Sequence, residues 1–472
     1  MTDFAPGLER LFDFVPEDGT YRLAATAGEL PPWLHGTAYW NGPARFRRGE
    51  DRYRHWLDGD GMVSALAFGP NGATFTRRFV ASHKWKAEEE AGRFRFRAFG
   101  TRFEGDELVR GVQLASPVNV SVIPFAGRLL ACGEQGLPFE LDGKSLETLG
   151  EHSFGGRLNM VSPFSAHAKL DPETHELWNF GISFAAAQPQ LNLYRFAADG
   201  TMIYRRRHGL DLPASVHDFG LSGKAAIVHL GPYLMDVRRF MQVGISVMES
   251  LSWEPERGSR LLLYSRETGD FLSSVAVGSG YCLHQINAFE DEAGHLVVDL
   301  LELEEPVYKD YEPLPDLFID VKPAHPTRYV VDAVKGELLE TLRLPFAQAA
   351  DFPVHEPRLG SRPYRHFWML GIAATGRTGR KFLDRLHRGD WERGTVEEIY
   401  ASPENCHLAG EPVVVPHPEG GEPLVIVPEF DLAKETGRFL VIEGEKVLSR
   451  LEVPSLLQPG FHGCWATLQM AP

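Results

Sequence analysis

Residues 118–142 read VNVSVIPFAGRLLACGEQGLPFELD. Three short runs rich in valine, leucine, isoleucine and phenylalanine are separated by turns that contain glycine or proline. Such runs, bounded by turn residues, are typical of short β-strands rather than of helices. The stretch therefore predicts three consecutive strands.

The same pattern recurs along the chain at residues 177–182, 225–230, 260–264, 295–300 and 424–428. Turns of the type Asp-Gly, Thr-Gly or Ala-Gly separate the runs, and long amphipathic segments are few. Many short strands at even intervals favour sheets arranged radially over one open sheet. We therefore expect an all-β fold, a β-propeller. No strict repeat marks the blades, so their number cannot be counted from the sequence.

The composition narrows the functional classes. The 472 residues are 43% hydrophobic and 24% charged, which is typical of a globular protein with a large core, and the net charge is −16. Nucleic-acid binding needs a clustered basic surface, so no nucleic-acid partner is expected. The short basic runs at 45–48 and 205–207 are interpreted as solvated strand ends.

Cellular location follows from the cysteines and the apolar runs. Cys132, Cys282, Cys406 and Cys464 are widely separated and contain no CxxC pair, which favours a reducing compartment. Residues 1–11 lack the pattern of a signal peptide, and no apolar run is long enough to span a bilayer. The sequence predicts a cytoplasmic protein.

Two stretches interrupt the strand pattern. Residues 232–251 are apolar with few charges and are predicted either to cover the core or to form an exposed lip that touches membrane and admits an apolar substrate. Residues 379–393 carry charges of both signs and are predicted to form a surface helix. The DGDG run at 58–61 predicts a tight turn, and it does not fit a calcium loop because no glutamate closes the ligand frame.

Four histidines lie in tight settings of low charge. They are His167 in SAHAKLD, His217 in SVHDF, His284 in CLHQIN and His462 in GFHG. A single buried histidine is most often a core residue. These four are separated by 50, 67 and 178 positions, or roughly one, one and three blades of about 40–50 residues. Because the inner strand of each blade faces a central channel, all four can converge on one metal.

The ligand set favours iron among the metals that imidazole binds. Imidazole suits iron, copper, zinc and nickel, but zinc usually takes a tetrahedral site with fewer histidines. Four neutral imidazoles leave two open positions in an octahedral set, at which O2 and substrate can meet. Glu134, Asp351 and Glu411 each lie in an apolar or turn context, and they are the candidates for the carboxylates that orient ligating histidines.

Four further motifs carry a resemblance to a known family. They are NGP at 41–43, HWLDGDGM at 55–62, EPV at 411–413 and GFHG at 460–463. In this order they resemble the signatures of the carotenoid cleavage oxygenases, which include stilbene-cleaving enzymes. The resemblance covers nearly the whole chain. It implies a single seven-bladed β-propeller domain over residues 1–472, with a cap of loops and helices over the metal face.

The resemblance also assigns the site. His167, His217, His284 and His462 match four ligands of Fe(2+), and Glu134, Asp351 and Glu411 match three outer glutamates. Asp351 departs from the pattern, because aspartate is shorter than glutamate by one methylene, about 1.5 Å of reach. Val120 stands where many members have threonine. Gly133 stands where stilbene-cleaving members often have a lysine that grips a phenolate.

The implied activity is oxidative cleavage of a conjugated C=C bond of a carotenoid or apocarotenoid by O2, giving two carbonyl products. One alternative is cleavage of a stilbenoid or propenyl-phenol by the same chemistry, and another is a propeller that binds apolar ligands without turnover. The chain has neither a GxSxG elbow nor a P-loop. The sequence does not indicate an oligomeric state.

Overall fold

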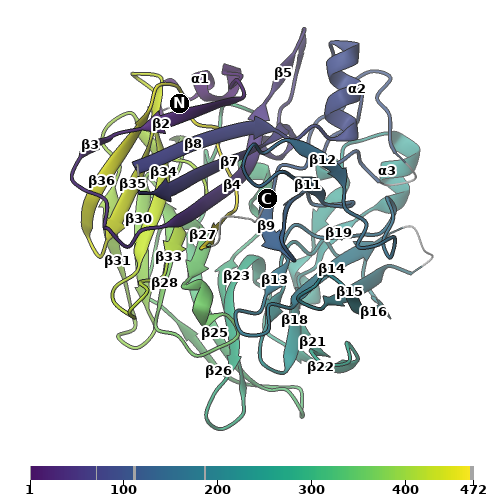
Figure 1. Ribbon diagram of the computed structural model, residues 1–472. Coiled ribbons are helices and arrows are strands. Elements are labelled where there is room, and N and C mark those ends of the chain that lie inside the picture. Colours follow the sequence, from purple (N-terminus) through teal and green to yellow (C-terminus); the bar gives the residue numbers. More distant parts are fainter. Residues whose placement is uncertain (1, 71, 110–112, 185–187, 468–472) are drawn as a thin grey trace.

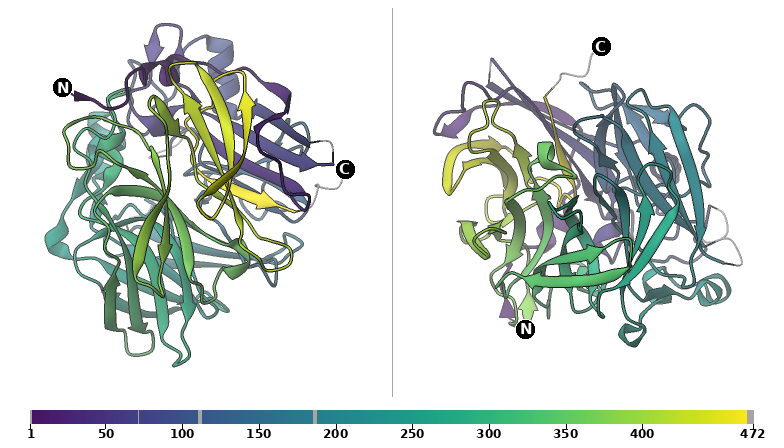
Figure 2. Two further views of the ribbon diagram at one scale, coloured as in Figure 1. Left: turned by 90° about the vertical axis from the view of Figure 1, so that its left-hand side faces the viewer. Right: turned by 90° about the horizontal axis from the view of Figure 1, so that it is seen from below.

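The computed structural model describes residues 2–70, 72–109, 113–184 and 188–467. Seven sheets of four or more strands lie around a common centre (Figures 1 and 2), as the blades of a seven-bladed β-propeller. Both the all-β prediction and the number of blades implied by the family resemblance are confirmed.

The blades are antiparallel sheets, and the strands of each are named in order from one edge of the sheet to the other. The first three are β2 (Gly19–Leu23), β8 (Gly72–Phe79), β7 (Asp60–Gly69), β4 (Gly36–Arg45) and β37 (Gly463–Ala466); β12 (Thr148–Glu151), β11 (Phe139–Leu141), β10 (Arg128–Cys132) and β9 (Ser121–Phe125); and β13 (Lys169–Leu170), β14 (Leu177–Ser183), β15 (Gln190–Phe196) and β16 (Met202–Gly209). The 118–142 stretch thus supplies strands of one blade, as its pattern predicts.

Four further blades complete the ring. They are β17 (Gly220–Leu221), β18 (Ala225–Leu230), β21 (Arg260–Ser265) and β22 (Phe271–Ala276); β23 (Tyr281–Glu290), β24 (Leu296–Leu303), β25 (Ala324–Asp332) and β26 (Glu337–Arg343); β27 (Ala349–His355), β28 (His366–Ile372), β30 (Arg385–Asp390) and β31 (Thr395–Ala401); and β3 (Ala25–Ala27), β36 (Lys446–Val453), β35 (Thr436–Glu443), β34 (Leu424–Asp431) and β32 (Cys406–Leu408), with β33 (Val413–Val415) also on β34.

The ring is closed by strands from the two ends of the chain. β37, near the C-terminus, pairs with β4, near the N-terminus, in the register Gly463 to Trp40. Neighbouring blades pack face to face through buried apolar side chains. For example, Phe180 and Leu193 of one blade share a cluster with Val228 and Leu262 of the next. Closure leaves each blade between two others, which buries both faces of most sheets.

Short helices and strand pairs lie outside the blades. They are α1 (Glu9–Asp13), α2 (His83–Ala91), α3 (Val237–Val243), the 3-10 turns η1 (Trp56–Asp58), η2 (Met248–Ser250), η3 (Pro255–Arg257), η4 (Val307–Tyr311) and η5 (Pro357–Leu359), and the pairs β1 (Thr2–Asp3) with β29 (Gly379–Arg380), β5 (Arg47–Arg48) with β6 (Asp51–Arg52), and β19 (Tyr233–Met235) with β20 (Leu251–Trp253). Helices α1, α2 and α3 lie in the upper half of Figure 1.

The surface helix predicted over residues 379–393 is wrong. Residues 385–390 of that stretch form β30, where Arg385 and Arg388 pair with Glu398 and Glu397 of the neighbouring strand β31. A strand at the surface can carry charged side chains that pair with the neighbouring strand, just as an exposed helix carries charged side chains. Charge content alone therefore does not distinguish the two structures.

The apolar stretch 232–251 forms β19, α3 and η2. Phe240 is fully buried, whereas Met241 and Val243 of the same helix are exposed. None of the helices in the described parts of the chain is long and apolar enough to cross a bilayer. Peripheral membrane contact through this stretch stays a prediction.

Some polar groups that the sequence places at the surface are buried. Arg48 belongs to a basic run interpreted as a solvated strand end, but it is 7% exposed and pairs with the buried Asp60 at 2.7 Å. Asp58 is also buried and accepts hydrogen bonds from Thr101 and from the backbone of Gly100. The acids of the DGDG run therefore join separate segments of the chain through buried contacts.

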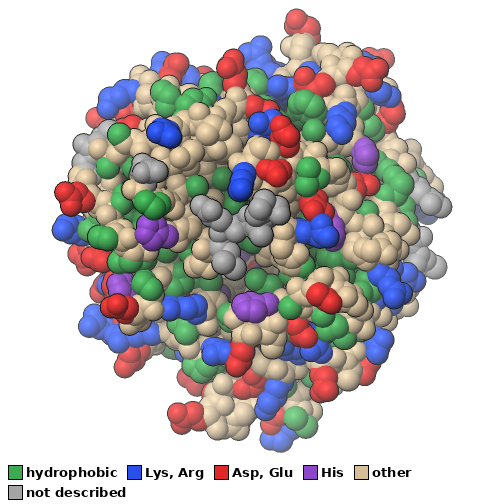
Figure 3. Space-filling model, in the orientation of Figure 1, with side chains coloured by type: hydrophobic (Ala, Val, Ile, Leu, Met, Phe, Trp, Pro, Cys, Tyr) green, Lys and Arg blue, Asp and Glu red, His purple; other side chains and the backbone are tan. Residues whose placement is uncertain are grey.

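The four cysteines are all free thiols. On the face shown in Figure 3, acidic and basic side chains are intermixed.

Candidate metal centre

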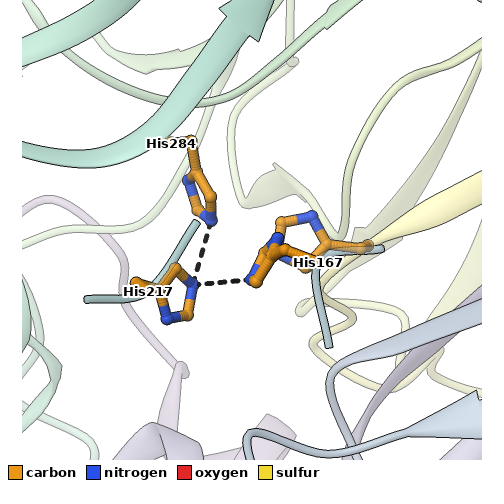
Figure 4. Close-up of side chains that lie close together, drawn as sticks. His167, His217 and His284 are labelled. Atoms are coloured by element: carbon orange, nitrogen blue, oxygen red, sulfur yellow. Dashed lines mark hydrogen bonds between the residues drawn. The ribbon is translucent and has the colours of Figure 1, made fainter. Parts of the chain in front are cut away.

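The four predicted histidines meet at one point. His167, His217, His284 and His462 are all buried, and one ring nitrogen of each lies within 4.8 Å of the others. The Nε2 atom of His217 is 2.9 Å from Nε2 of His167 and 3.2 Å from Nε2 of His284 (Figure 4). Two nitrogens bound to one metal at about 2.1 Å and at right angles are about 3 Å apart. The spacing of the imidazoles therefore fits a shared metal ion.

The ring of blades brings these side chains together. His167 lies just before β13, His217 just before β17, His284 on β23 and His462 just before β37. Each of these strands is an edge strand of its own sheet, and the four sheets are four different blades. On β23 the register shifts between Cys282 and Gln285. Such a bulge re-aims a side chain, here His284, out of the regular ladder.

Close packing of glycines places His462. A Cβ atom on Gly42 would lie 2.4 Å from Cα of Gly460, so the NGP and GFHG motifs touch through their backbones. The backbone N–H of Asn41 donates to the carbonyl of His462, and the N–H of His462 donates to that of Val120. These motifs thus tie the last inner strand to the first two blades.

Burial opposes protonation of two of the four imidazoles and lowers their pKa. Burial and the three neighbouring histidines lower the pKa of His167 well below its usual value. Burial also lowers the pKa of His284, although Asp351 opposes that effect. For His217 the carboxylate of Glu134 outweighs burial and raises the pKa. Neutral imidazoles whose lone pairs face one point repel one another unless a cation lies between them, and this donor set fits a divalent transition metal.

The three predicted acids lie behind three of the four rings. The Nδ1 atom of His217 is 3.2 Å from Oε2 of Glu134, that of His284 is 2.5 Å from Oδ1 of Asp351, and that of His462 is 3.2 Å from Oε1 of Glu411. We call these three carboxylates the outer acids. An N–H that donates to a carboxylate fixes the tautomer and leaves Nε2 free to bind a metal.

The fourth histidine has a different neighbour, which sequence reasoning missed. Nδ1 of His167 lies 3.8 Å from Oδ1 of Asp218, too far for a hydrogen bond. Asp218 is buried and accepts from Nζ of Lys169 at 2.8 Å and from the N–H of Gln285 at 2.8 Å. It therefore connects the segments that carry His167, His217 and His284. The only signal in the sequence is adjacency, since Asp218 directly follows His217.

A small cavity opens beside the histidines. Its apolar wall consists of Leu57, Val120, Leu283, Phe352 and Phe461. Its polar wall consists of Glu134, Asp351, Tyr308 and Tyr311 together with His217, His284 and His462. Tyr308 and Tyr311 belong to η4, outside the blades, so the cap covers the centre as the family resemblance implies. Nothing in their sequence context marks these two tyrosines.

A closed propeller in which four blades each bring one histidine to a shared centre defines a class of β-propeller proteins with a candidate metal centre. The sequence model of the retinal pigment epithelial membrane protein family (RPE65) matches residues 12–467. The chain belongs to this family, that of the carotenoid cleavage oxygenases.

Relatives with different substrates match over nearly their whole length. The chain is 27% identical to apocarotenoid-15,15'-oxygenase of Synechocystis over 96% of this chain and 94% of that protein. It is 28% identical to isoeugenol monooxygenase of Pseudomonas putida, with 93% of each chain covered, and 26% identical to lignostilbene-alpha,beta-dioxygenase isozyme III of Sphingomonas paucimobilis, with 94% of each covered.

Solved structures share the fold. The cobalt-substituted Synechocystis apocarotenoid oxygenase superposes with a TM-score of 0.88 at 23% identity, covering 98% of this chain and all of that one. A chimera of that oxygenase with RPE65 gives the same TM-score at 24% identity, covering 98% of both chains. The family is thus one of carotenoid, apocarotenoid and stilbene-type oxygenases.

Proposed function

We propose that the chain is a non-haem Fe(II) dioxygenase that cleaves one conjugated C=C bond of a carotenoid or apocarotenoid with O2, giving two carbonyl products. The observation that carries this proposal is the meeting of four buried imidazoles beside an apolar cavity. Both oxygen atoms of O2 end in the products and the C=C bond is lost, so the reaction balances without an added reductant.

The residues have separate roles. Nε2 atoms of His167, His217, His284 and His462 would hold the iron, and the outer acids would orient three of these rings. When bound there, iron supplies the activation of O2. The apolar wall holds the alkene beside the centre and excludes water, and Val120 keeps a methyl group where many members have threonine. No side chain is required to act as a general acid or base.

A second candidate substrate is a phenolic alkene, either a stilbenoid or a propenyl-phenol. Two observations favour it. Tyr308 and Tyr311 line the cavity, and Oε1 of Glu134 is buried without a hydrogen-bond partner among the described residues, so it is free to accept from a substrate hydroxyl. Gly133, at the position of the phenolate-binding lysine, counts against it. Relatives named for isoeugenol and lignostilbene match the chain, so phenolic alkenes have to be tested beside carotenoids as substrates.

The test combines metal analysis with oxygen uptake. Protein purified with iron is offered an apocarotenal, isoeugenol and resveratrol in turn, and O2 consumption and product masses are measured. We expect about one iron per chain and two carbonyl products from the apocarotenal. Cleavage of the phenolic alkenes alone would establish the second candidate. Binding of these ligands without O2 uptake would show a binding propeller and would refute the proposal.

A further inference from the structure

Asp351, the shortest of the outer acids, lies at a break in its strand. The register of β27 against β28 shifts between Asp351 and Val354, and Phe352 has a φ of 55°. A left-handed conformation at a bulky residue is strained, so the surrounding structure holds it in place. The bulge turns the carboxylate toward His284, and Oδ1 also accepts from the N–H of Phe352 at 2.8 Å.

The second oxygen of Asp351 has a partner of its own. The hydroxyl of Tyr311 donates to Oδ2 at 3.0 Å. The other outer acids differ in this respect. Oε2 of Glu411 accepts from the backbone N–H of Gly463 at 2.9 Å, whereas Oε1 of Glu134 has no partner among the described residues. Asp351 is the outer acid whose free oxygen is held by a side chain.

Tyr311 is itself fixed by packing. It is 4% exposed, and its ring makes edge contacts with Trp56 at 5.3 Å and with Phe318 at 5.6 Å between centroids. Its neighbour Tyr308, on the same turn, lines the same cavity and lies edge-on to the ring of His217, at 6.2 Å between centroids. The phenol of Tyr311 therefore reaches Asp351 from a wall that has little freedom to move.

We propose that Tyr311 is a positioning residue for His284, and that it acts through Asp351. Donors on both oxygens prevent the carboxylate from rotating about its Cβ–Cγ bond, so the N–H of His284 has one acceptor in one orientation. The strained bulge brings the backbone closer and Tyr311 locks the carboxylate, and together they replace the reach of the methylene that aspartate lacks. This inference rests on the proposed metal centre.

The test measures affinity for Co(II), by competition with a chromophoric chelator, as well as turnover. Tyr311→Phe keeps the ring and removes only the hydroxyl. We expect it to weaken Co(II) binding by about 10-fold, the lower end of losses from outer contacts, and to alter the Co(II) visible spectrum. Tyr400→Phe is the matched control, because its hydroxyl donates to Glu429, a carboxylate paired with Arg438, and it is expected to leave Co(II) affinity unchanged. Circular dichroism confirms that each variant is folded.

A double-mutant cycle separates this role from a general effect on the cavity. Asp351→Glu restores the missing methylene, so Tyr311→Phe should cost less affinity in that background than in the native chain. Additive losses, equal losses in Tyr311→Phe and Tyr400→Phe, or native affinity in Tyr311→Phe would each overturn the inference. If His284→Ala also binds Co(II) as the native chain does, the proposed metal centre itself is refuted.

Discussion

Two buried groups of polar side chains in this propeller balance charge in opposite ways. The first, which we call the Lys84 cluster, consists of Arg48, Tyr53, Asp60, Lys84 and Glu88. Nζ of Lys84 donates to Asp60 at 2.8 Å, to Glu88 at 2.7 Å and to Tyr53 at 2.7 Å, and Arg48 pairs with the other oxygen of Asp60. Two cations face two anions, so the charges cancel within the chain.

The four-histidine centre has no such balance. The pKa values of His167 and His284 are lowered, and the three outer acids lie directly behind His217, His284 and His462. Burying carboxylates without a cation is costly. The difference teaches that a buried polar group whose charges cancel serves the fold, whereas one that lacks a counter-charge is shaped for a ligand from outside. The following changes test this distinction.

Removing a ligand should abolish metal binding and leave the fold intact. His284→Ala deletes one of the four converging nitrogens, so we expect no iron occupancy and no turnover. Iron content by elemental analysis and the thermal midpoint of the metal-free protein are the measurements. Normal iron content would contradict the assignment of His284.

Breaking the Lys84 cluster should destabilise the fold and leave the metal centre intact. Lys84→Met leaves Asp60 and Glu88 buried without their ammonium partner, and loss of one member of a buried ion pair costs about 3–5 kcal/mol of unfolding free energy. Urea denaturation of the metal-free protein measures it. Lys434→Met is the control, because the Lys434 side chain is 72% exposed and its pair with Asp431 should contribute less than about 1 kcal/mol. Equal effects of the two substitutions would show that the cluster does not stabilise the fold.

Loss of an outer acid should weaken the metal centre without emptying it. Asp351→Ala removes the acceptor of His284, so we expect metal affinity to fall by 10- to 100-fold, as is typical of outer contacts. Equilibrium dialysis against a chelator gives the affinity. Unchanged affinity would mean that the bulge alone positions His284.

The smallest effect concerns an acid beside the Lys84 cluster. Burial raises the pKa of Asp58 to about 7, although hydrogen bonds from Thr101 and Gly100 oppose the rise. Because this pKa is above that of the unfolded chain, the folded state takes up a proton. Its contribution to stability is therefore greatest below pH 4 and is lost as the pH rises toward 7, by at most about 1.4 kcal/mol per pH unit.

Asp58→Asn tests this titration. The amide keeps the shape of the side chain and cannot ionise, so the decline in stability between pH 5.5 and 6.5 should be smaller than in the native chain. Urea midpoints of both proteins at the two pH values give the difference, and the histidines common to both cancel. Parallel profiles would show that Asp58 does not titrate in this range.

The sequence by itself determined the strand pattern, the radial arrangement of sheets and the histidines and acids that meet at the centre. Strand runs and turn residues are local signals, and the motifs carry the identity of the site. Only the tertiary structure decided which atoms face one another. Asp218 connects three segments that carry histidines, Tyr311 reaches Asp351 from outside the blades, and Arg48 is buried against Asp60. The charged residues near 385–390 lie on a strand and not on a helix. These features depend on contacts between distant residues, and spacing along the chain does not encode such contacts, because packing of the closed ring sets them.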